Sequence, residues 1–194
     1  MLTSDELIKE ISATMTKTKV VKLSAIIKKQ QFSLKDLIDI TFHPDKNIAF
    51  RAAWILENLF LQKPESYIEN LDYLISRVKD VDNPSCKRHY AKILMHITSP
   101  KAPASIKQKL ADTDLEPVVE QLFDWLIDPK VLIAVKVFAA DALFNIRNRY
   151  PWIAEELANQ IRFLMRDGTA AIQSRGRKIL SRISSSGSCS WQES

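Results

Sequence analysis

The sequence predicts an all-α protein, a solenoid of about four stacked helix pairs that follow an N-terminal helical pair. Three observations support this prediction. A short leucine-centred motif recurs four times along the chain. Glycines number three, with no hairpin turn signals between strand-like runs. The stretch 130–152, "KVLIAVKVFAADALFNIRNRYPW", is apolar on most sides yet too polar for a membrane span, so other helices must surround it.

The recurring motif aligns four segments on one leucine each, and it identifies the second helix of every pair. The segments are 48–59, 86–97, 135–146 and 172–183, anchored at Leu56, Leu94, Leu143 and Leu180. The anchors are separated by 38, 49 and 37 residues. The long interval contains 99–114, "SPKAPASIKQKLADTD", which predicts a short extra helix in a loop. A helix pair with this period is typical of an α-solenoid.

An amphipathic helix precedes each of these segments. We expect these first helices at 33–42, 66–79, 116–127 and 151–166. Their starts carry suitable residues: Ser33 and Ser66 for N-caps, Pro117 and Pro151 for a first turn. Two further helices, near 4–15 and 18–30, are expected to form an atypical pair at the N-terminal end of the stack.

Small residues in the second helices allow neighbouring backbones to approach closely. Ala139 and Ala140 have this role in the stretch quoted above, and Gly176 takes the equivalent place in the last repeat. We expect one helical domain over 1–183. The segment 184–194, "SSSGSCSWQES", is rich in serine and has little to bury, so it is predicted to be a flexible tail.

The repeat pattern resembles that of HEAT repeats, most clearly in "VKVFAADALFNI" with its basic residue and its small core residues. A closer resemblance is to short bacterial HEAT-like proteins, many of which are labelled adenylosuccinate lyase. The segments that carry it are "RAAWILE" (51–57), "FDWLI" (123–127), "AVKVFAADALF" (134–144) and "PWIAEEL" (151–157). It spans most of residues 35–183 and implies a preformed concave surface lined by the second helices.

Catalysis is not expected. Lyases of the adenylosuccinate superfamily are longer and use a mobile "GSSxMPxKxN"-type loop with a catalytic serine, whereas "SSSGSCSW" (184–191) lacks the Met-Pro-Lys-Asn part. No closely spaced glycines are present to hold the phosphates of a nucleotide cofactor. Cys86, His89 and His96 cannot close a tetrahedral metal site alone, because His96 lies about 10 Å further along the helix than His89. We therefore predict no cofactor and no metal.

The expected location is the cytoplasm. The N-terminus turns acidic at once, unlike a signal peptide, and the longest aliphatic run, "VLIAV", falls far short of a membrane span. The two cysteines, Cys86 and Cys189, are interpreted as free thiols. The basic helix near 18–30 could lie on a membrane surface, but its apolar residues are better explained by packing, so no membrane partner is predicted.

The candidate binding surface follows from helix geometry. Two positions before and two after each anchor leucine point away from the core, and stacking aligns them in two rows. The first row is Trp54, Lys92, Asp141 and Lys178, and the second is Asn58, His96, Asn145 and Arg182. Phe50 and Glu57 lie beside Trp54. An exposed Trp in such a row is typical of an anchor for an unknown protein partner. The other interpretation is that Trp54 packs as core under the N-terminal helix pair.

Nucleic acid is the alternative partner. Residues 145–182 hold eight basic and three acidic residues, which matches the net charge of +5 of the whole chain. Arg175, Lys178 and Arg182 share one face of the last helix and could contact phosphates, or they could be the polar cap that a terminal repeat needs. Alkylpurine DNA glycosylases are small HEAT-like solenoids that use Trp, Asp and Arg side chains, and this chain has Trp54, Asp141 and Arg182 in its rows.

Overall fold

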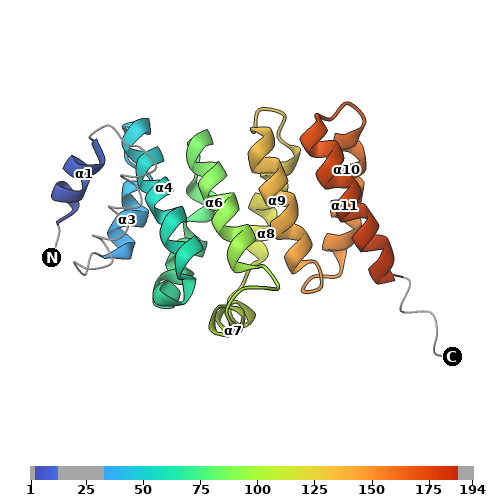
Figure 1. Cartoon of the computed structure of the whole chain (residues 1–194), viewed down its shortest axis with the longest axis horizontal. Helices are drawn as coiled ribbons and strands as arrows, with labels where there is room; N and C mark the ends of the chain where they lie inside the picture. The colour runs from blue at the N-terminus through green and yellow to red at the C-terminus, as the bar shows by residue number, and fades with distance from the viewer. Residues whose placement is uncertain (1–2, 13–32, 188–194) are drawn as a thin grey trace.

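The computed structural model describes residues 3–12 and 33–187, and within these ranges every regular element is a helix (Figure 1). The helices pair as the repeat predicts, so the protein is an all-α solenoid. The pairs are α3 (Leu34–Ile40) with α4 (Lys46–Gln62), α5 (Leu71–Ser76) with α6 (Pro84–Ile97), α8 (Glu116–Ile127) with α9 (Ile133–Ile146), and α10 (Trp152–Met165) with α11 (Ala170–Gly187).

Among the described residues, two α-helices lie outside the four pairs. The predicted extra helix in the long interval is α7 (Ala104–Asp112), and α1 (Ser4–Ser12) is the first helix of the expected N-terminal pair. Arg51 on α4 donates hydrogen bonds to the backbone oxygens of Ile11 and Ser12, which ties the end of α1 to the stack. The second expected helix, near 18–30, lies outside the described residues.

Two of the predicted helix starts are confirmed: Ser33 caps α3, and Pro117 lies in the first turn of α8. Pro151 lies at the N-cap of α10, just before its first turn. The side chains of Ser33, Asp45 and Asn83 accept backbone hydrogen bonds at the starts of α3, α4 and α6. The single helix predicted over 66–79 is wrong. This segment is a 3₁₀-helix η1 (Pro64–Asn70), the short α5 and a second 3₁₀-helix η2 (Val78–Asp80), and Ser66 lies inside η1 rather than at a cap.

The break in this segment has a local cause. Tyr67 leaves helical geometry at φ −124° and ψ 19°, and its ring packs 5.6 Å from the ring of Phe60. An aromatic contact with the preceding helix is therefore made at the residue where regular hydrogen bonding is lost. Periodicity alone could not reveal this, because the apolar spacing of the segment is the same whether its helix is continuous or interrupted.

Helix α9, which is apolar on most sides, is surrounded by other helices as predicted. It contacts α8 within its own pair, α6 in the preceding repeat, and α10 and α11 in the following one. Ala139 and Ala140 are buried where these backbones approach, as predicted. Gly176 is also buried in α11, where a Cβ atom would collide with the side chain of Met165. Small residues thus set the spacing of neighbouring helices.

One lysine is buried within this packing. Lys136 on α9 is 4% exposed, and its Nζ donates a hydrogen bond of 2.9 Å to the backbone oxygen of Leu126 in the last turn of α8. A cation at the C-terminal end of a helix satisfies a carbonyl that has no partner within that helix. Burial lowers the pKa of Lys136, and the bond compensates for part of that desolvation. The basic residue of the repeat therefore joins the two helices of its pair.

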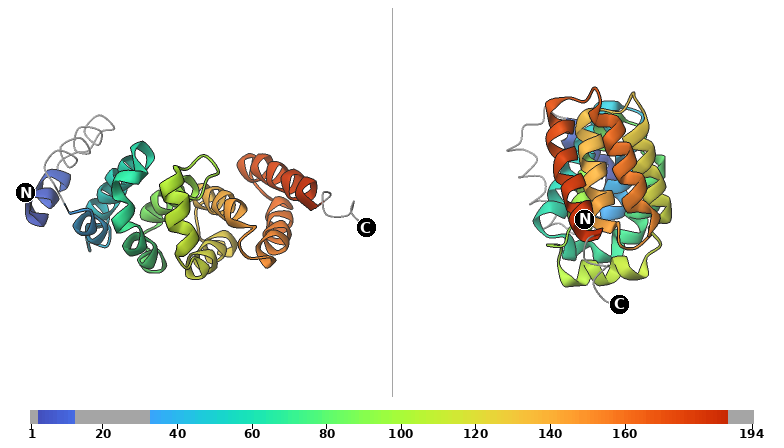
Figure 2. Two further views of the ribbon diagram at one scale, coloured as in Figure 1. Left: turned by 90° about the horizontal axis from the view of Figure 1, so that it is seen from below. Right: turned by 90° about the vertical axis from the view of Figure 1, so that its right-hand side faces the viewer.

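The helices form two layers in a shallow arch. Figure 2 shows the first helices of the pairs along the outer side and α4, α6, α9 and α11 along the inner side. Neighbouring second helices contact each other in chain order along this inner layer. Within the described residues, no helix combines the length and apolarity needed to cross a membrane.

The domain limit predicted at residue 183 lies within the last helix. Helix α11 continues to Gly187, while 188–194 lie outside the described residues. Three anchor leucines, Leu56, Leu94 and Leu143, are at most 1% exposed, whereas Leu180 is half-buried. Within the described residues, α11 packs mainly on α9 and α10, so this last anchor is less covered.

Candidate functional site

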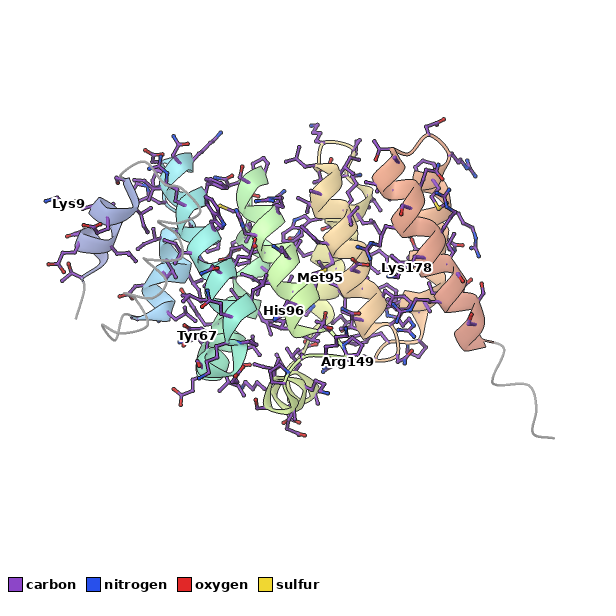
Figure 3. The ribbon with its side chains drawn as sticks, in the orientation of Figure 1. Lys9, Tyr67, Met95, His96, Arg149 and Lys178 are labelled. Atoms are coloured by element: carbon purple, nitrogen blue, oxygen red, sulfur yellow. The ribbon has the colours of Figure 1, made fainter. Side chains whose placement is uncertain are left out.

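The inner layer carries the two rows of residues that the sequence predicts. Each second helix contributes one residue to each row: Trp54 and Asn58 on α4, Lys92 and His96 on α6, Asp141 and Asn145 on α9, Lys178 and Arg182 on α11. Figure 3 shows His96 on α6 and Lys178 on α11 on the same inner side of the molecule. The rows are not uniform, because the two ends of the layer pack differently.

The N-terminal end is closed by a buried carboxylate, Glu57 on α4. Glu57 is 7% exposed, and both of its oxygens are bound by α6: His89 Nδ1 lies 2.5 Å from Oε2, and Lys92 Nζ lies 2.6 Å from Oε1. Burial by itself would raise the pKa of Glu57, but the hydrogen bonds from His89 and Lys92 outweigh it, so the pKa lies below its ordinary value. We call these three residues the Glu57 bridge.

The imidazole in this bridge is enclosed by the packing. His89 has no exposed surface, the ring of Phe50 lies 5.3 Å from its ring, and its Nε2 has no hydrogen-bond partner within the described structure. With the proton on Nδ1, His89 donates to Glu57 and leaves a lone pair unused on Nε2. The bridge thus fixes α4 against α6, and Glu57 is not available to a partner.

The sequence left open whether Trp54 is exposed on the inner layer or buried in the core, and its burial in the structure is intermediate. It is half-buried, packs partly on the core and stands next to Phe50, with ring centroids 6.0 Å apart. Phe50 is half-buried as well. Phe50 therefore packs on the His89 ring of the Glu57 bridge, Trp54 lies beside Phe50, and both rings keep some exposed aromatic surface.

The C-terminal end of the inner layer is open. A hollow of about 370 Å³ lies between α6, α9 and α11, and we call it the Asp141 hollow. Its lining brings together five of the residues predicted from sequence: His96, Asp141, Asn145, Arg175 and Arg182. Lys178 is exposed on the same face of α11 without lining the hollow.

Asp141 faces basic side chains across this hollow. Its Oδ2 lies 3.4 Å from Arg175 Nε, with the Asp141 side chain 15% exposed. Burial raises the pKa of Asp141 above its ordinary value, although the charges of Arg175, Lys178 and Arg182 act in the opposite direction. The carboxylate is therefore less well compensated than Glu57, even with three cations near it.

The aromatic ring of Phe144 contacts two arginines: Arg182, which lines the hollow, and Arg147, which follows the last residue of α9. The guanidinium of Arg182 lies 4.5 Å from the ring centroid of Phe144, and that of Arg147 lies 3.9 Å from it. Burial and the charge of Arg182 both lower the pKa of Arg147. Burial and the charge of Lys92 likewise lower the pKa of His96. Positive charge is therefore concentrated at this end of the layer.

One row residue, Asn145, is used to hold two helices together, and another, Asn58, lies outside the hollow. Asn145 donates from Nδ2 to the backbone oxygen of Met95 at 3.1 Å and to Thr98 Oγ1 at 3.3 Å, so it secures the end of α6 against α9. Asn58 is half-buried on α4, outside the hollow.

The sequence reasoning missed part of the lining. Met95 and Phe144 line the hollow, as do loop residues 99–101 after α6. Met95 and Phe144 directly follow their anchor leucines, the position that Glu57 occupies in the first repeat. This third row was visible in the alignment. It escaped notice because apolar residues beside an anchor are normally assigned to the core.

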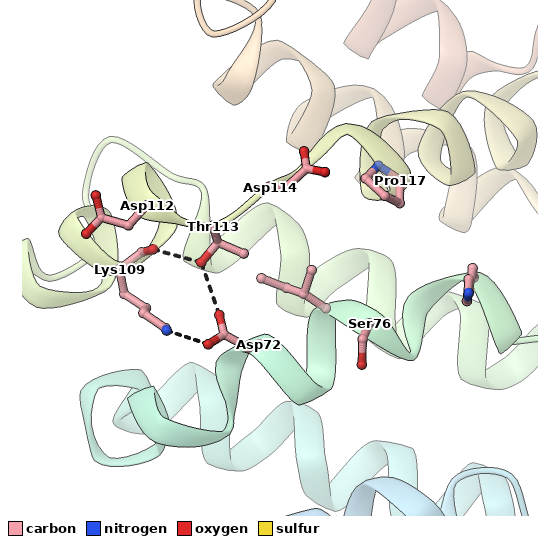
Figure 4. Close-up of a pocket in the computed structure, with 9 residues that line it drawn as sticks. Asp72, Ser76, Lys109, Asp112, Thr113, Asp114 and Pro117 are labelled. Atoms are coloured by element: carbon pink, nitrogen blue, oxygen red, sulfur yellow. Dashed lines mark hydrogen bonds and ion pairs between the residues drawn. The ribbon is translucent and has the colours of Figure 1, made fainter.

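A larger hollow, of about 490 Å³, lies elsewhere, between α5, α7 and the segment that leads to α8 (Figure 4). It contains none of the residues predicted from sequence. Asp72 there pairs with Lys109 and accepts a 3.1 Å hydrogen bond from Thr113 Oγ1. These polar groups bind one another and hold α7 on the solenoid, so we assign this hollow a structural role.

The chemistry of metal binding and thiol catalysis is not assembled in the described part of the chain. No three His, Cys, Asp or Glu side chains gather there in a way that could hold a metal ion. Cys86 is buried, and burial raises the pKa of its thiol to about 12, which disfavours the nucleophilic thiolate.

Comparison with known proteins agrees with the architecture. The model of the HEAT repeat domain matches residues 7–183, which includes the first three helix pairs, most of α1 and the fourth pair except for the last turn of α11. A search of curated proteins gives no match. HEAT repeat domains are generally non-catalytic and commonly mediate interactions between proteins. With its paired helices, its recurring leucine anchors and a family match over nearly its whole length, the chain belongs to the HEAT repeat family.

Proposed function

We propose that the protein is a non-catalytic interaction module that binds a protein partner on its inner layer. One observation carries the proposal: α4, α6, α9 and α11 place a half-exposed aromatic pair, Phe50 and Trp54, in the same layer as the charged Asp141 hollow. An aromatic anchor together with specific polar contacts is typical of a protein interface.

The contact residues that we propose are those of the two rows that remain accessible, together with their neighbours Phe50 and Arg175. They are Phe50, Trp54, Asn58, Lys92, His96, Asp141, Arg175, Lys178 and Arg182. Glu57 and Asn145 are left out because their polar groups serve contacts within the chain. We place the function in the cytoplasm, since Cys86 is a free thiol and free thiols are typical of a reducing compartment.

Site-specific crosslinking tests this proposal while the partner is still unidentified. A photo-crosslinking amino acid at His96 on the inner layer should capture one defined protein in the native cell. The same amino acid at Glu120 on α8 or Glu155 on α10, both exposed on the outer layer, should not capture it. Capture from the outer positions, or from none, would count against an interface on the inner layer.

The second candidate function is nucleic-acid binding, and it is favoured by one feature. Lys178 is exposed on the face of α11 that also carries Arg175 and Arg182. If these groups contact phosphates, affinity should fall steeply with salt and should disappear when all three are replaced by Ala. A gel shift at physiological salt tests this, and submicromolar binding that depends on these residues would favour the nucleic-acid function.

A further inference from the structure

We infer that the Asp141 hollow is a carboxylate-binding subsite that takes an acidic peptide segment of the protein partner. This inference rests on the proposed interaction function and specifies the chemistry that the partner presents. The hollow lies between three second helices, so a peptide bound there would contact successive repeats at once.

The charges that line the hollow favour an anion. Arg175 and Arg182 line it from α11, and Lys101 lines it from the loop after α6, whereas Asp141 is the one acidic group among the lining residues. Guanidinium groups bind carboxylates through two parallel hydrogen bonds, a geometry that a lysine does not offer. A carboxylate is therefore the ligand group that this lining recognises best.

The spacing of the arginines indicates more than one carboxylate. Arg175 and Arg182 are two helical turns apart, which corresponds to about 10 Å along the axis of α11. An extended peptide advances by about 3.3 Å per residue. Acidic residues about three positions apart in such a peptide would match this separation.

The base of the hollow is apolar and raises the strength of such contacts. Met95 and Phe144 line it, and the face of the Arg182 guanidinium packs on the Phe144 ring. Stacking uses the face of a guanidinium, whereas a carboxylate binds at its edge, so both contacts are compatible. Charge-assisted hydrogen bonds beside apolar side chains are less screened by water than those on an open surface.

A peptide fits the inner layer better than nucleic acid. A nucleic-acid backbone needs a continuous basic track, yet in the preceding repeat Lys92 is paired with Glu57 and the aromatic rings of Phe50 and Trp54 follow. The hollow, of about 370 Å³, is near the lower end of the range of small-ligand pockets, about 300–1,000 Å³. A few side chains match this size.

Asp141 acts as an internal competitor in this arrangement. Its carboxylate lies beside Arg175 where a carboxylate of the partner would bind, and the contact of 3.4 Å between Asp141 Oδ2 and Arg175 Nε is long for an ion pair. Replacing Asp141 by Asn removes the repulsion between Asp141 and an incoming carboxylate. Affinity for an acidic peptide should then rise about threefold to tenfold.

A selection experiment tests the inference directly. A displayed library of random peptides is selected on the wild-type protein, on an Arg175→Gln/Arg182→Gln variant and on an Arg162→Gln/Arg177→Gln control. The control removes the same charge from exposed positions that do not line the hollow. We expect peptides with paired acidic residues to be enriched on the wild type and the control, and to disappear on the first variant.

Fluorescence anisotropy with a labelled, enriched peptide then measures how much the two arginines contribute to affinity. Loss of both arginines should weaken binding about 30-fold or more, while the control stays within about twofold of the wild type. Thermal melts of all variants establish that each is folded. Equal weakening in the control would show a general charge effect and overturn the inference.

Other outcomes separate the subsite from the proposed function. Enrichment of peptides without acidic residues overturns the carboxylate subsite and leaves the interaction function standing. If crosslinking from His96 also captures no protein, both fail together. A single-stranded oligonucleotide of equal charge serves as the competing probe. Tighter binding of this oligonucleotide, lost in the Arg175→Gln/Arg182→Gln variant, overturns the inference in favour of nucleic acid.

Discussion

Two carboxylates of the inner layer, Glu57 and Asp141, face basic side chains of the next second helix, and packing gives them opposite properties. Glu57 on α4 is bound at both oxygens by His89 and Lys92, and its pKa is lowered. Asp141 on α9 meets Arg175 at 3.4 Å beside a hollow, and its pKa is raised. One arrangement joins two repeats, and the other leaves a place for a ligand.

The difference between the two regions teaches how a solenoid can turn a structural contact into a binding site. Helix α6 lies between α4 and α9 and contacts both, whereas α11 is the last helix of the described residues and contacts α9 and α10. The ring of Phe50 packs on His89 of the Glu57 bridge, but the space around Asp141 forms the hollow. A pair of opposite charges between second helices therefore stabilises the fold where it is fully packed, as at Glu57. Where packing leaves a hollow beside it, as at Asp141, the pair is accessible to a ligand.

Removing the buried carboxylate of Glu57 should give the largest loss of stability among the charge-removing variants proposed. Glu57→Ala leaves His89 and Lys92 without their acceptor in a buried position, so we expect a loss of about 3 kcal/mol in the free energy of unfolding. Chemical denaturation measures this value. Asp141→Ala is the matched control at the open end and should cost less than about 1 kcal/mol. Similar losses in both variants would abolish the distinction between the two regions.

The half-buried Trp54 should contribute less to the free energy of unfolding than the buried core leucine Leu56. Trp54 is half-buried, so Trp54→Ala should lower the free energy of unfolding by about 1–2 kcal/mol, compared with about 3 kcal/mol for the fully buried Leu56→Ala. Thermal and denaturant melts of the two variants decide this. If Trp54→Ala costs as much as Leu56→Ala, Trp54 belongs to the core and the proposed interface loses its anchor.

The pH dependence of stability should have opposite signs at the two carboxylates. The lowered pKa of Glu57 means that its stabilisation is present above the unfolded value of about 4.5 and is lost as pH falls through the folded pKa. The raised pKa of Asp141 means that its charge costs stability at neutral pH, and that this cost disappears as pH falls through the folded pKa.

Two isosteric variants measure this contrast. At pH 7 we expect Glu57→Gln to be less stable than the wild type and Asp141→Asn to be slightly more stable, by less than about 1 kcal/mol. Both differences should shrink as the unfolding experiment is moved to acidic pH, first for Asp141→Asn and then for Glu57→Gln. A stability loss for Asp141→Asn at pH 7 would show that its pairing with Arg175 outweighs its desolvation, and the open end would then be structural.

The smallest effect is expected at Lys178, which is exposed on α11. Lys178→Ala should change the free energy of unfolding by less than about 0.5 kcal/mol, since it removes no packing. Denaturation beside the wild type is sufficient to test this. A larger loss would mean that the basic face of α11 stabilises the end of the solenoid rather than serving a partner.

The sequence by itself determined the class of fold and the register of the repeats. Apolar periodicity and the four anchor leucines are local properties, and each of them requires the same helix pairing whatever the neighbours are. For the same reason the sequence placed the two rows of residues on the inner layer. It also predicted the close contacts at Ala139, Ala140 and Gly176, because small residues in a buried helix allow neighbouring backbones to approach closely.

The tertiary structure alone decided which row residues remain accessible. Glu57 and Asp141 both lie within two positions of an anchor leucine, but their exposure and pairing depend on side chains from other repeats. Glu57 is bound by His89 and Lys92, and Asp141 pairs with Arg175. Exposure and pKa are set by the sum of long-range contacts, which spacing along the chain does not encode. The hollow between α6, α9 and α11 arises in the same way, because three helices that are far apart in the sequence are needed to form it.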